Sequence, residues 1–350
     1  MLENQIFVTG VYRSGTTILT GLLGAHKEID IGSPSVQYFR YIIKKNISPA
    51  LYKDIVISIA ERVEFRYSIK LDVNRIISDI EKSSKEKITH KLIYGVVMRA
   101  LHNNSGRRWG EKILLEWTNI PLFLEMYPSG KTIHIIRDPR DVLASYKHMT
   151  YETEEKYLDA IFNCLDSMQH AKEYSKNLSK ENYYLIKFED LVSDRMGQIE
   201  KICDYLDIEF NETDYSDENI KEGIGEDSIR LTFETHSSFP NSNQKSFKRW
   251  DKNLTRNELD LAEAILGDCM NYFGYDVSQN FTSNNFQWLL KIMKDNPLIK
   301  DRFANYLETG QGAEGFPSDP TDPKNWASAT LSQGKELEKG AALAYKKLFD

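Results

Sequence analysis

One stretch near the start of the chain, residues 10–17, reads GVYRSGTT and restricts the possible folds more than any other feature. An apolar run at residues 6–8 precedes it, as in a buried parallel strand, and apolar residues from Ile18 onward begin a helix. A strand, a glycine loop and a helix N-terminus together form an anion cradle, because the free N–H groups of the loop and the helix dipole converge on a bound phosphate. We expect a phosphate-binding loop here, with an ordinary tight turn as the alternative.

The loop departs from that of nucleoside triphosphatases at one position. Gly10 and Gly15 match the first half of the pattern GxxxxGK[ST], but Thr16 stands where the pattern requires lysine, and the basic side chain is Arg13, inside the loop. In triphosphatases that lysine and Mg²⁺ neutralise the β- and γ-phosphates. A loop with Arg13 and two threonines suits a ligand that has a 5′-phosphate and transfers a different group.

The composition is that of a globular protein with an acidic balance. The 350 residues allow one large domain or two ordinary ones. Charged residues make up 28%, hydrophobic residues 41%, and the net charge is −7. Nucleic acid is therefore not an expected partner, and an anion site requires basic residues that are concentrated locally.

The cysteines and the N-terminus indicate a reducing compartment. Cys164, Cys203 and Cys269 lie far apart and form no CxxC or CxxH pattern, so neither a disulfide framework nor a zinc site is predicted. The first residues lack the features of a signal peptide, and no apolar run has transmembrane length. We expect a cytoplasmic protein.

Strand and helix patterns alternate along the chain, which predicts an α/β fold with a P-loop-like parallel sheet flanked by helices. Strands are expected at residues 107–112, 131–136 and 183–188. One helix is expected to begin near residue 142, a second to span 154–178, and a third to follow residues 189–191 and end near 206. We expect residues 41–105 to form a helical insertion, which is either a substrate lid or an outer packing layer.

The C-terminal part divides into a core segment and an extension. We expect one α/β domain at residues 1–280 and a helical extension of unknown role at 281–350. Polar composition predicts loops at 211–245 and 310–326, and apolar periodicity predicts helices at 259–273, 286–293 and 336–349.

Two further segments carry signals for an anion. Arg137 follows a buried strand and Ser145 lies eight residues later, so the two can meet at one phosphate outside the carboxyl end of the sheet. The alternative for residues 137–141, RDPRD, is a helix-capping turn with salt bridges. Residues 246–250, SFKRW, are a basic and aromatic cluster in an acidic protein, and a solvated patch is the alternative there.

Together these motifs resemble the sulfotransferases that use 3′-phosphoadenosine-5′-phosphosulfate (PAPS), and their bacterial and Golgi-type branches more than the small-phenol cytosolic enzymes. GVYRSGTT is similar to the family's 5′-phosphosulfate loop, IHIIRDPRDVLAS to its 3′-phosphate strand–helix motif, and SFKRWDKNLT to its C-terminal nucleotide loop. WGEK resembles the element W-G-x-K-T-P, and KFEDL resembles a strand-end E-D-L. The resemblance covers roughly residues 5–276, in the family's order.

The resemblance implies transfer of a sulfonate group to a hydroxyl or amine of a small-molecule, sugar or carrier-bound acceptor, with adenosine 3′,5′-bisphosphate (PAP) as product and no metal. Lys112 would lie near the sulfonate and, with Arg13, would stabilise the charge that develops there. The residues implied in nucleotide binding are Gly10, Tyr12, Arg13, Ser14, Gly15, Thr16, Thr17, Arg137, Ser145, Ser246, Lys248 and Arg249.

Two departures from the family pattern leave the general base open. WGEK continues as Ile113-Leu114 instead of Thr-Pro, and residues 32–37, where Golgi-type members place a catalytic glutamate, contain no carboxylate. Candidates for the base are Glu111, beside Lys112, and His236. Alternatively, Glu111 is a salt-bridge partner and His236 a loop residue.

Two other classes of function compete with an active sulfotransferase. A nucleotide-binding protein that has lost catalysis and acts through partners would fit the missing glutamate. A P-loop kinase would need a lysine at position 16 and Mg²⁺ ligands, which the sequence does not show.

Overall fold

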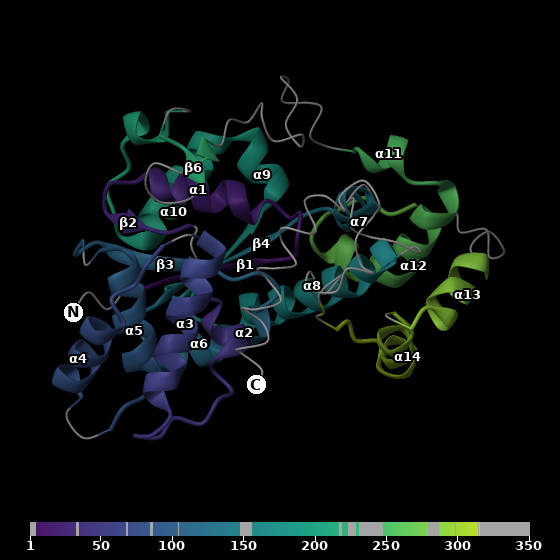
Figure 1. Cartoon of the computed structure of the whole chain (residues 1–350). Coiled ribbons are helices and arrows are strands. Elements are labelled where there is room, and N and C mark those ends of the chain that lie inside the picture. The colour runs from purple at the N-terminus through teal and green to yellow at the C-terminus, as the bar shows by residue number, and fades with distance from the viewer. Residues whose placement is uncertain are drawn as a thin grey trace.

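A parallel sheet of five strands forms the centre of the protein in the computed structural model (Figure 1). The strand order is β2-β3-β1-β4-β5, and all neighbouring pairs are parallel. The strands are β1 Ile6–Gly10, β2 Ile29–Asp30, β3 Arg108–Lys112, β4 Lys131–Ile136 and β5 Tyr183–Lys187. The predicted α/β class, with a parallel sheet flanked by helices, is confirmed.

The structure describes residues 5–32, 35–67, 69–84, 87–103, 105–147, 156–216, 219–222, 229–230, 248–278, 287–297, 299–313 and 315. The helices are α1 Thr16–Ala25, α2 Tyr38–Tyr41, α3 Tyr52–Tyr67, α4 Val73–Ser83, α5 His90–Leu101, α6 Ile120–Met126, α7 Pro139–Lys147, α8 Ala160–Asn177, α9 Phe188–Ser193, α10 Arg195–Leu206, α11 Trp250–Asn253, α12 Arg256–Tyr272, α13 Gln287–Asp295 and α14 Lys300–Thr309. Short 3₁₀ turns lie at Trp117–Asn119, Lys156–Asp159 and Glu212–Tyr215.

The central strand shows why helices cover both faces of the sheet. Successive side chains of a strand point to opposite faces, and every residue of β1 is buried. Ile6 and Val8 pack in a hydrophobic cluster with α1 and α10, whereas Phe7 packs in a second cluster with α3, α5 and α8. Figure 1 shows α1 and α10 on one side of the sheet, with α3 and α5 on the other.

The helical insertion predicted at residues 41–105 packs closely on the sheet. Ile59 and Val63 of α3 and Tyr94 and Val97 of α5 are buried in the same cluster as Phe7 of β1. The described residues of the insertion therefore form a packed layer, while a role as a substrate lid stays a prediction.

Several predicted boundaries were wrong. Helix α7 begins at Pro139 and not near Val142, because proline suits the first helical position and Asp138 Oδ1 accepts a hydrogen bond from Arg140 N at 2.9 Å. The segment predicted as a loop at 211–245 contains a 3₁₀ turn and the antiparallel pair β6 Lys221–Glu222 and β7 Ile229–Arg230. The helix predicted at 336–349 lies outside the described residues, as does most of the loop at 310–326.

The described part of the C-terminal extension lies against α8. The rings of Phe303 and Phe162 are 6.1 Å apart, and Arg302 forms an ion pair with Asp159. Gln169 donates a hydrogen bond to the Gly310 carbonyl at 2.9 Å. The division of the chain at residue 280 stays a prediction. No helix within the described ranges is both long and apolar enough to cross a membrane.

His134 of β4 makes stability depend on pH. Its ring is fully buried between Tyr183 and Ser167, and burial, with a smaller effect of His170, lowers its pKa to about 3. Below the ordinary histidine pKa the unfolded chain therefore binds a proton that the folded protein does not. The free energy of unfolding therefore decreases as the pH is lowered. Between pH 7.5 and 5 we expect a loss of roughly 2 kcal/mol from this residue.

Urea unfolding at the two pH values measures this loss. His134→Gln, which keeps a hydrogen-bonding group but cannot be protonated, should lose correspondingly less stability on acidification. An equal loss in both proteins would show that His134 is not the group responsible.

Candidate active site

The loop at residues 10–17 is held by close packing at both of its glycines. A Cβ atom on Gly10 would lie 2.6 Å from the Ile135 carbonyl oxygen of β4. Gly15 has φ 99°, and a Cβ there would lie 2.3 Å from the Phe188 ring. Both positions therefore require glycine. At Gly10 and Gly15 there is no room for a side chain, and Gly15 also has a left-handed backbone conformation.

The loop leads directly into the N-terminus of α1. Ser14 closes the turn, with its N–H and its hydroxyl both donating to the Val11 carbonyl at 3.1 and 2.6 Å. Helical hydrogen bonding begins with Leu19 N donating to Gly15 O at 3.0 Å. The preceding N–H groups, around Thr16 and Thr17, have no partner within the helix, and this is the arrangement that binds anions.

Arg13 connects this loop to α7. It has φ 68°, a left-handed conformation that costs a non-glycine residue about 1–3 kcal/mol and is most often kept at functional sites. Its Nε donates to Ser145 Oγ at 2.8 Å, and its carbonyl accepts a hydrogen bond from Arg137 Nη1 at 2.9 Å. The structure thus brings together the predicted residues Arg13, Arg137 and Ser145, and Tyr12 also packs edge-on against Tyr146 of α7.

Positive charges gather around this contact. Arg137 is buried, and its guanidinium carbon lies 4.3 Å from the centre of the Phe188 ring. Its Nη2 forms an ion pair with Asp141 Oδ2 at 3.7 Å. Burial lowers the pKa of Arg249, the positive charges of Arg137 and Arg13 lower it further, and Asp141 raises it. Three guanidinium groups from three chain segments thus share this region with the carboxylate of Asp141, a charge balance that suits a bound phosphate.

Lys112 approaches the loop from the other side. It ends β3, and its Nζ donates to Thr17 Oγ1 in the first turn of α1 at 3.1 Å. Because β1 lies between β3 and β4, Lys112 and Arg137 flank the loop on opposite sides. The side chain of Arg13 bonds Ser145 beside Arg137, and the expectation that Arg13 and Lys112 act on the same group stays a prediction.

Glu111 lies on the opposite face of β3 from Lys112, because neighbours in a strand alternate. It is fully buried, with Oε1 accepting from Ser35 Oγ at 2.6 Å and from Gln37 N at 2.7 Å, and Oε2 accepting from Tyr94 OH at 2.5 Å. Burial raises the pKa of Glu111, and these hydrogen bonds oppose the rise. This position gives no support to Glu111 as a general base, and it shows a carboxylate that joins β3 to the insertion and to the segment after β2.

The remaining predicted residues are only partly placed. Lys248 is exposed, with φ 58°, and directly precedes Arg249. His236 and Ser246 lie outside the described residues, so their assigned roles stay predictions.

A set of buried charges that was not predicted lies beside the site. Arg140 donates to Asp138 through Nε at 3.0 Å and Nη2 at 2.8 Å, and to Glu263 of α12 through Nη1 at 2.7 Å. Glu189 accepts a hydrogen bond from Asp138 N at 2.8 Å and another from Tyr275 OH at 2.9 Å. The signal was available in the alternating charges of RDPRD. The alternative interpretation of that segment as a helix-capping turn with salt bridges is confirmed, and its role in phosphate binding stays a prediction.

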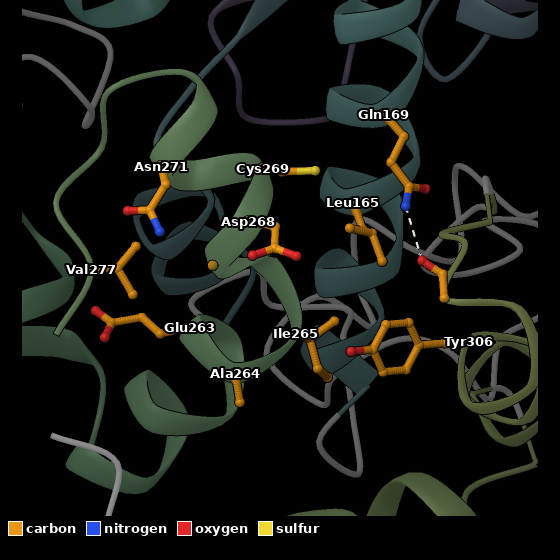
Figure 2. Close-up of a pocket in the computed structure, with 12 residues that line it drawn as sticks. Leu165, Gln169, Glu263, Ala264, Ile265, Asp268, Cys269, Asn271, Val277 and Tyr306 are labelled. Carbon is orange, nitrogen blue, oxygen red and sulfur yellow. Dashed lines mark hydrogen bonds between the residues drawn. The ribbon is translucent and has the colours of Figure 1, made fainter. Parts of the chain in front are cut away.

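A cavity lies between α8, α12 and α14 (Figure 2), and Glu263, which binds Arg140, is among the residues that line it. Its volume is about 390 Å³, and Figure 2 shows Asp268 of α12 opposite Leu165 of α8, with Tyr306 of α14 closing one end. None of the residues predicted for the site lines it.

The chain belongs to the sulfotransferase family: a model of the Sulfotransferase family matches residues 5–212, which is more than half of the sequence. A protein-tyrosine sulfotransferase of Drosophila melanogaster is 22% identical over 211 residues, covering 59% of this chain. The match spans only 38% of the length of that curated relative.

Two solved structures share the fold. The sulfotransferase domain from the curacin biosynthetic pathway has a TM-score of 0.50 at 17% identity, covering 79% of this chain and 99% of that one. The sulfotransferase domain of the Synechococcus PCC 7002 olefin synthase has a TM-score of 0.53 at 18% identity, covering 79% and 96%.

Replacing Glu111 by alanine should destabilise the fold. The change leaves two buried hydroxyls and the half-buried N–H of Gln37 without this acceptor, and we expect the free energy of unfolding to fall by about 3–5 kcal/mol. Urea unfolding measures this, with the exposed Glu125→Ala as a control that should stay within about 0.5 kcal/mol of wild type.

Glu111→Gln separates support from proton transfer, because its amide oxygen can still accept from Ser35 and Gln37 and its NH2 group can donate to the Tyr94 oxygen, but it cannot serve as a base at neutral pH. We expect it to fold and to keep most of its turnover. A folded Glu111→Gln protein that loses turnover about 100-fold or more would restore Glu111 as the general base.

Proposed function

We propose that this protein transfers a sulfonate group from PAPS to a hydroxyl or amine of a small-molecule, sugar or carrier-bound acceptor. The observation that carries the proposal is the convergence of Arg13, Arg137, Ser145 and Arg249 on one side of the glycine loop and of Lys112 on the other. A ligand with one anionic group within the loop and further anionic groups on both sides fits this charge arrangement.

The residues present fit the nucleotide donor, which would supply the sulfonate when bound. The N–H groups around Thr16 and Thr17 suit its 5′-phosphate, because a helix N-terminus binds anions. Arg137 and Ser145 suit the 3′-phosphate, and the side chain of Arg13 joins them. Lys112 is left beside the first turn of α1, where the transferred group would lie.

Lys112 has the main catalytic role in this proposal. Transfer of a sulfonate spreads negative charge over its oxygens and over the leaving phosphate oxygen, and a cation already in place lowers the energy of that state. Its hydrogen bond to Thr17 holds the ammonium group at the loop before any ligand arrives. Arg13 and Arg137 act mainly on binding, since they lie at the other end of the site.

The alternative function is that of a nucleotide-binding protein without catalysis. It is favoured by the burial of Glu111, one of the two predicted bases; the other, His236, lies outside the described residues. Turnover of the donor with a panel of hydroxyl and amine acceptors distinguishes an enzyme from a binding protein.

The first test is binding of PAP. We expect calorimetry to show the same affinity with and without a chelator, and a much lower affinity for ATP–Mg²⁺. Arg137→Ala should weaken PAP about 10- to 100-fold, as a lost charge-assisted hydrogen bond predicts, and adenosine 5′-phosphate far less. Arg75→Ala, an exposed arginine of α4, is the control and should bind both as wild type does.

Stronger binding of ATP–Mg²⁺ than of PAP would contradict the proposed donor. Equal losses for the two adenosine phosphates in Arg137→Ala would mean that Arg137 supports the fold only.

Lys112→Ala tests catalysis. If Lys112 stabilises charge that develops during transfer, single-turnover rates should fall about 100- to 1,000-fold while donor affinity changes by less than about three-fold. Lys201→Ala is the control, because Lys201 is an exposed lysine of α10, away from the loop. A folded Lys112→Ala protein with a normal transfer rate would remove Lys112 from the mechanism.

A further inference from the structure

The first turn of α7 and the start of α11 are joined by an aromatic stack that the proposed donor site does not itself use. The guanidinium of Arg140 lies 4.2 Å from the centre of the Trp250 ring. Asp138 and Glu263 hold that guanidinium through three hydrogen bonds of 2.7–3.0 Å, and all three charged side chains are buried. Arg140 is therefore a fixed platform, and the Trp250 ring rests on it.

The backbone of the same segment is fixed by a second contact. Trp250 N donates to Asp141 Oδ1 at 3.2 Å, and Asp141 also pairs with Arg137. Figure 1 shows α11, which begins with Trp250, beside α7, which contains Arg140 and Asp141. Since Arg249 directly precedes Trp250, the two contacts together determine where Arg249 lies.

Arg249 needs such support because its neighbours repel it. Burial lowers the pKa of Arg249 most, the positive charges of Arg137 and Arg13 lower it further, and the carboxylate of Asp141 opposes them. A loop with this charge would move away from the site in the absence of an anion unless other contacts opposed the movement. The stack on Arg140 and the hydrogen bond to Asp141 supply that opposition.

We propose that Arg140 and Trp250 are positioning residues that hold Arg249 beside Arg137, and so raise the affinity of the site for the 3′-phosphate of its nucleotide. The identity of that phosphate rests on the function proposed above. A preformed cation site binds more tightly because the ligand does not have to order the loop. The indole N–H of Trp250 is buried and has no hydrogen-bond partner among the residues that the structure describes, so the ring face provides the contact.

The test compares two substitutions of Trp250. Trp250→Ala removes the stack, and we expect it to weaken PAP about ten-fold, as the loss of a partly buried cation–π contact predicts, with less than about two-fold effect on adenosine 5′-phosphate. Trp250→Phe keeps an aromatic face on Arg140 and should bind both nucleotides nearly as wild type does. Calorimetry gives the affinities, and thermal melting confirms that each protein is folded.

Tyr272→Ala is the matched control. Tyr272 is an exposed aromatic residue at the C-terminal end of α12, and Lys172 Nζ lies 4.6 Å from the centre of its ring. The substitution therefore removes a similar cation–π contact at the end of α12 that is remote from Arg249. Its affinities for both nucleotides should not change.

Three results would overturn the inference and leave the proposed donor site standing. These are an unchanged PAP affinity in Trp250→Ala, equal losses for PAP and adenosine 5′-phosphate, and a Trp250→Phe protein as weak as Trp250→Ala. A wild-type protein that binds neither nucleotide would overturn the proposed function, and with it the inference.

Discussion

The gathering of Arg13, Arg137 and Arg249 around the single carboxylate of Asp141 is the physical constraint on which the site depends. Like charges that are partly withdrawn from water repel strongly, so they remain together only where the surrounding structure holds them. Arg137 is held by Phe188, Asp141 and the Arg13 carbonyl. The carboxyl edge of the sheet is therefore prepared for an anion, because a bound phosphate would relieve the repulsion.

A chain of buried polar contacts connects this edge to the C-terminal third of the protein. Glu189, at the start of α9, accepts hydrogen bonds from Asp138 N after β4 and from Tyr275 after α12. Lys187, at the end of β5, donates to the Phe273 carbonyl at 3.1 Å. Losing one member would leave its buried partners unsatisfied, so these contacts fix α12 against the strand ends. Lys248 and Arg249 precede α11 and α12 in the chain, and α12 is itself fixed at the strand ends.

Much of this arrangement could be predicted from sequence, since it follows from local patterns. The apolar runs before Gly10 and Arg137 predicted β1 and β4, and parallel strands place their carboxyl ends at one edge. The meeting of Arg13 with Ser145 could not be predicted, because it depends on a left-handed backbone at a non-glycine residue. The pairing of Arg140 with Glu263 joins residues far apart in the sequence, and no local pattern encodes such a contact.

The pair Glu111–Lys112 shows how two adjacent residues come to serve different parts of the molecule. A period of two residues sends one side chain to each face of β3. The face of Lys112 meets the N-terminus of α1, where a cation can act on a ligand, and the face of Glu111 meets Tyr94 and the residues that follow β2. The carboxylate that sequence proximity suggested as a base is thus separated from the loop by the strand itself. Its contacts with Ser35 and Gln37 fix the segment after β2, so a buried carboxylate of β3 orders the segment in which the family resemblance led us to expect a glutamate.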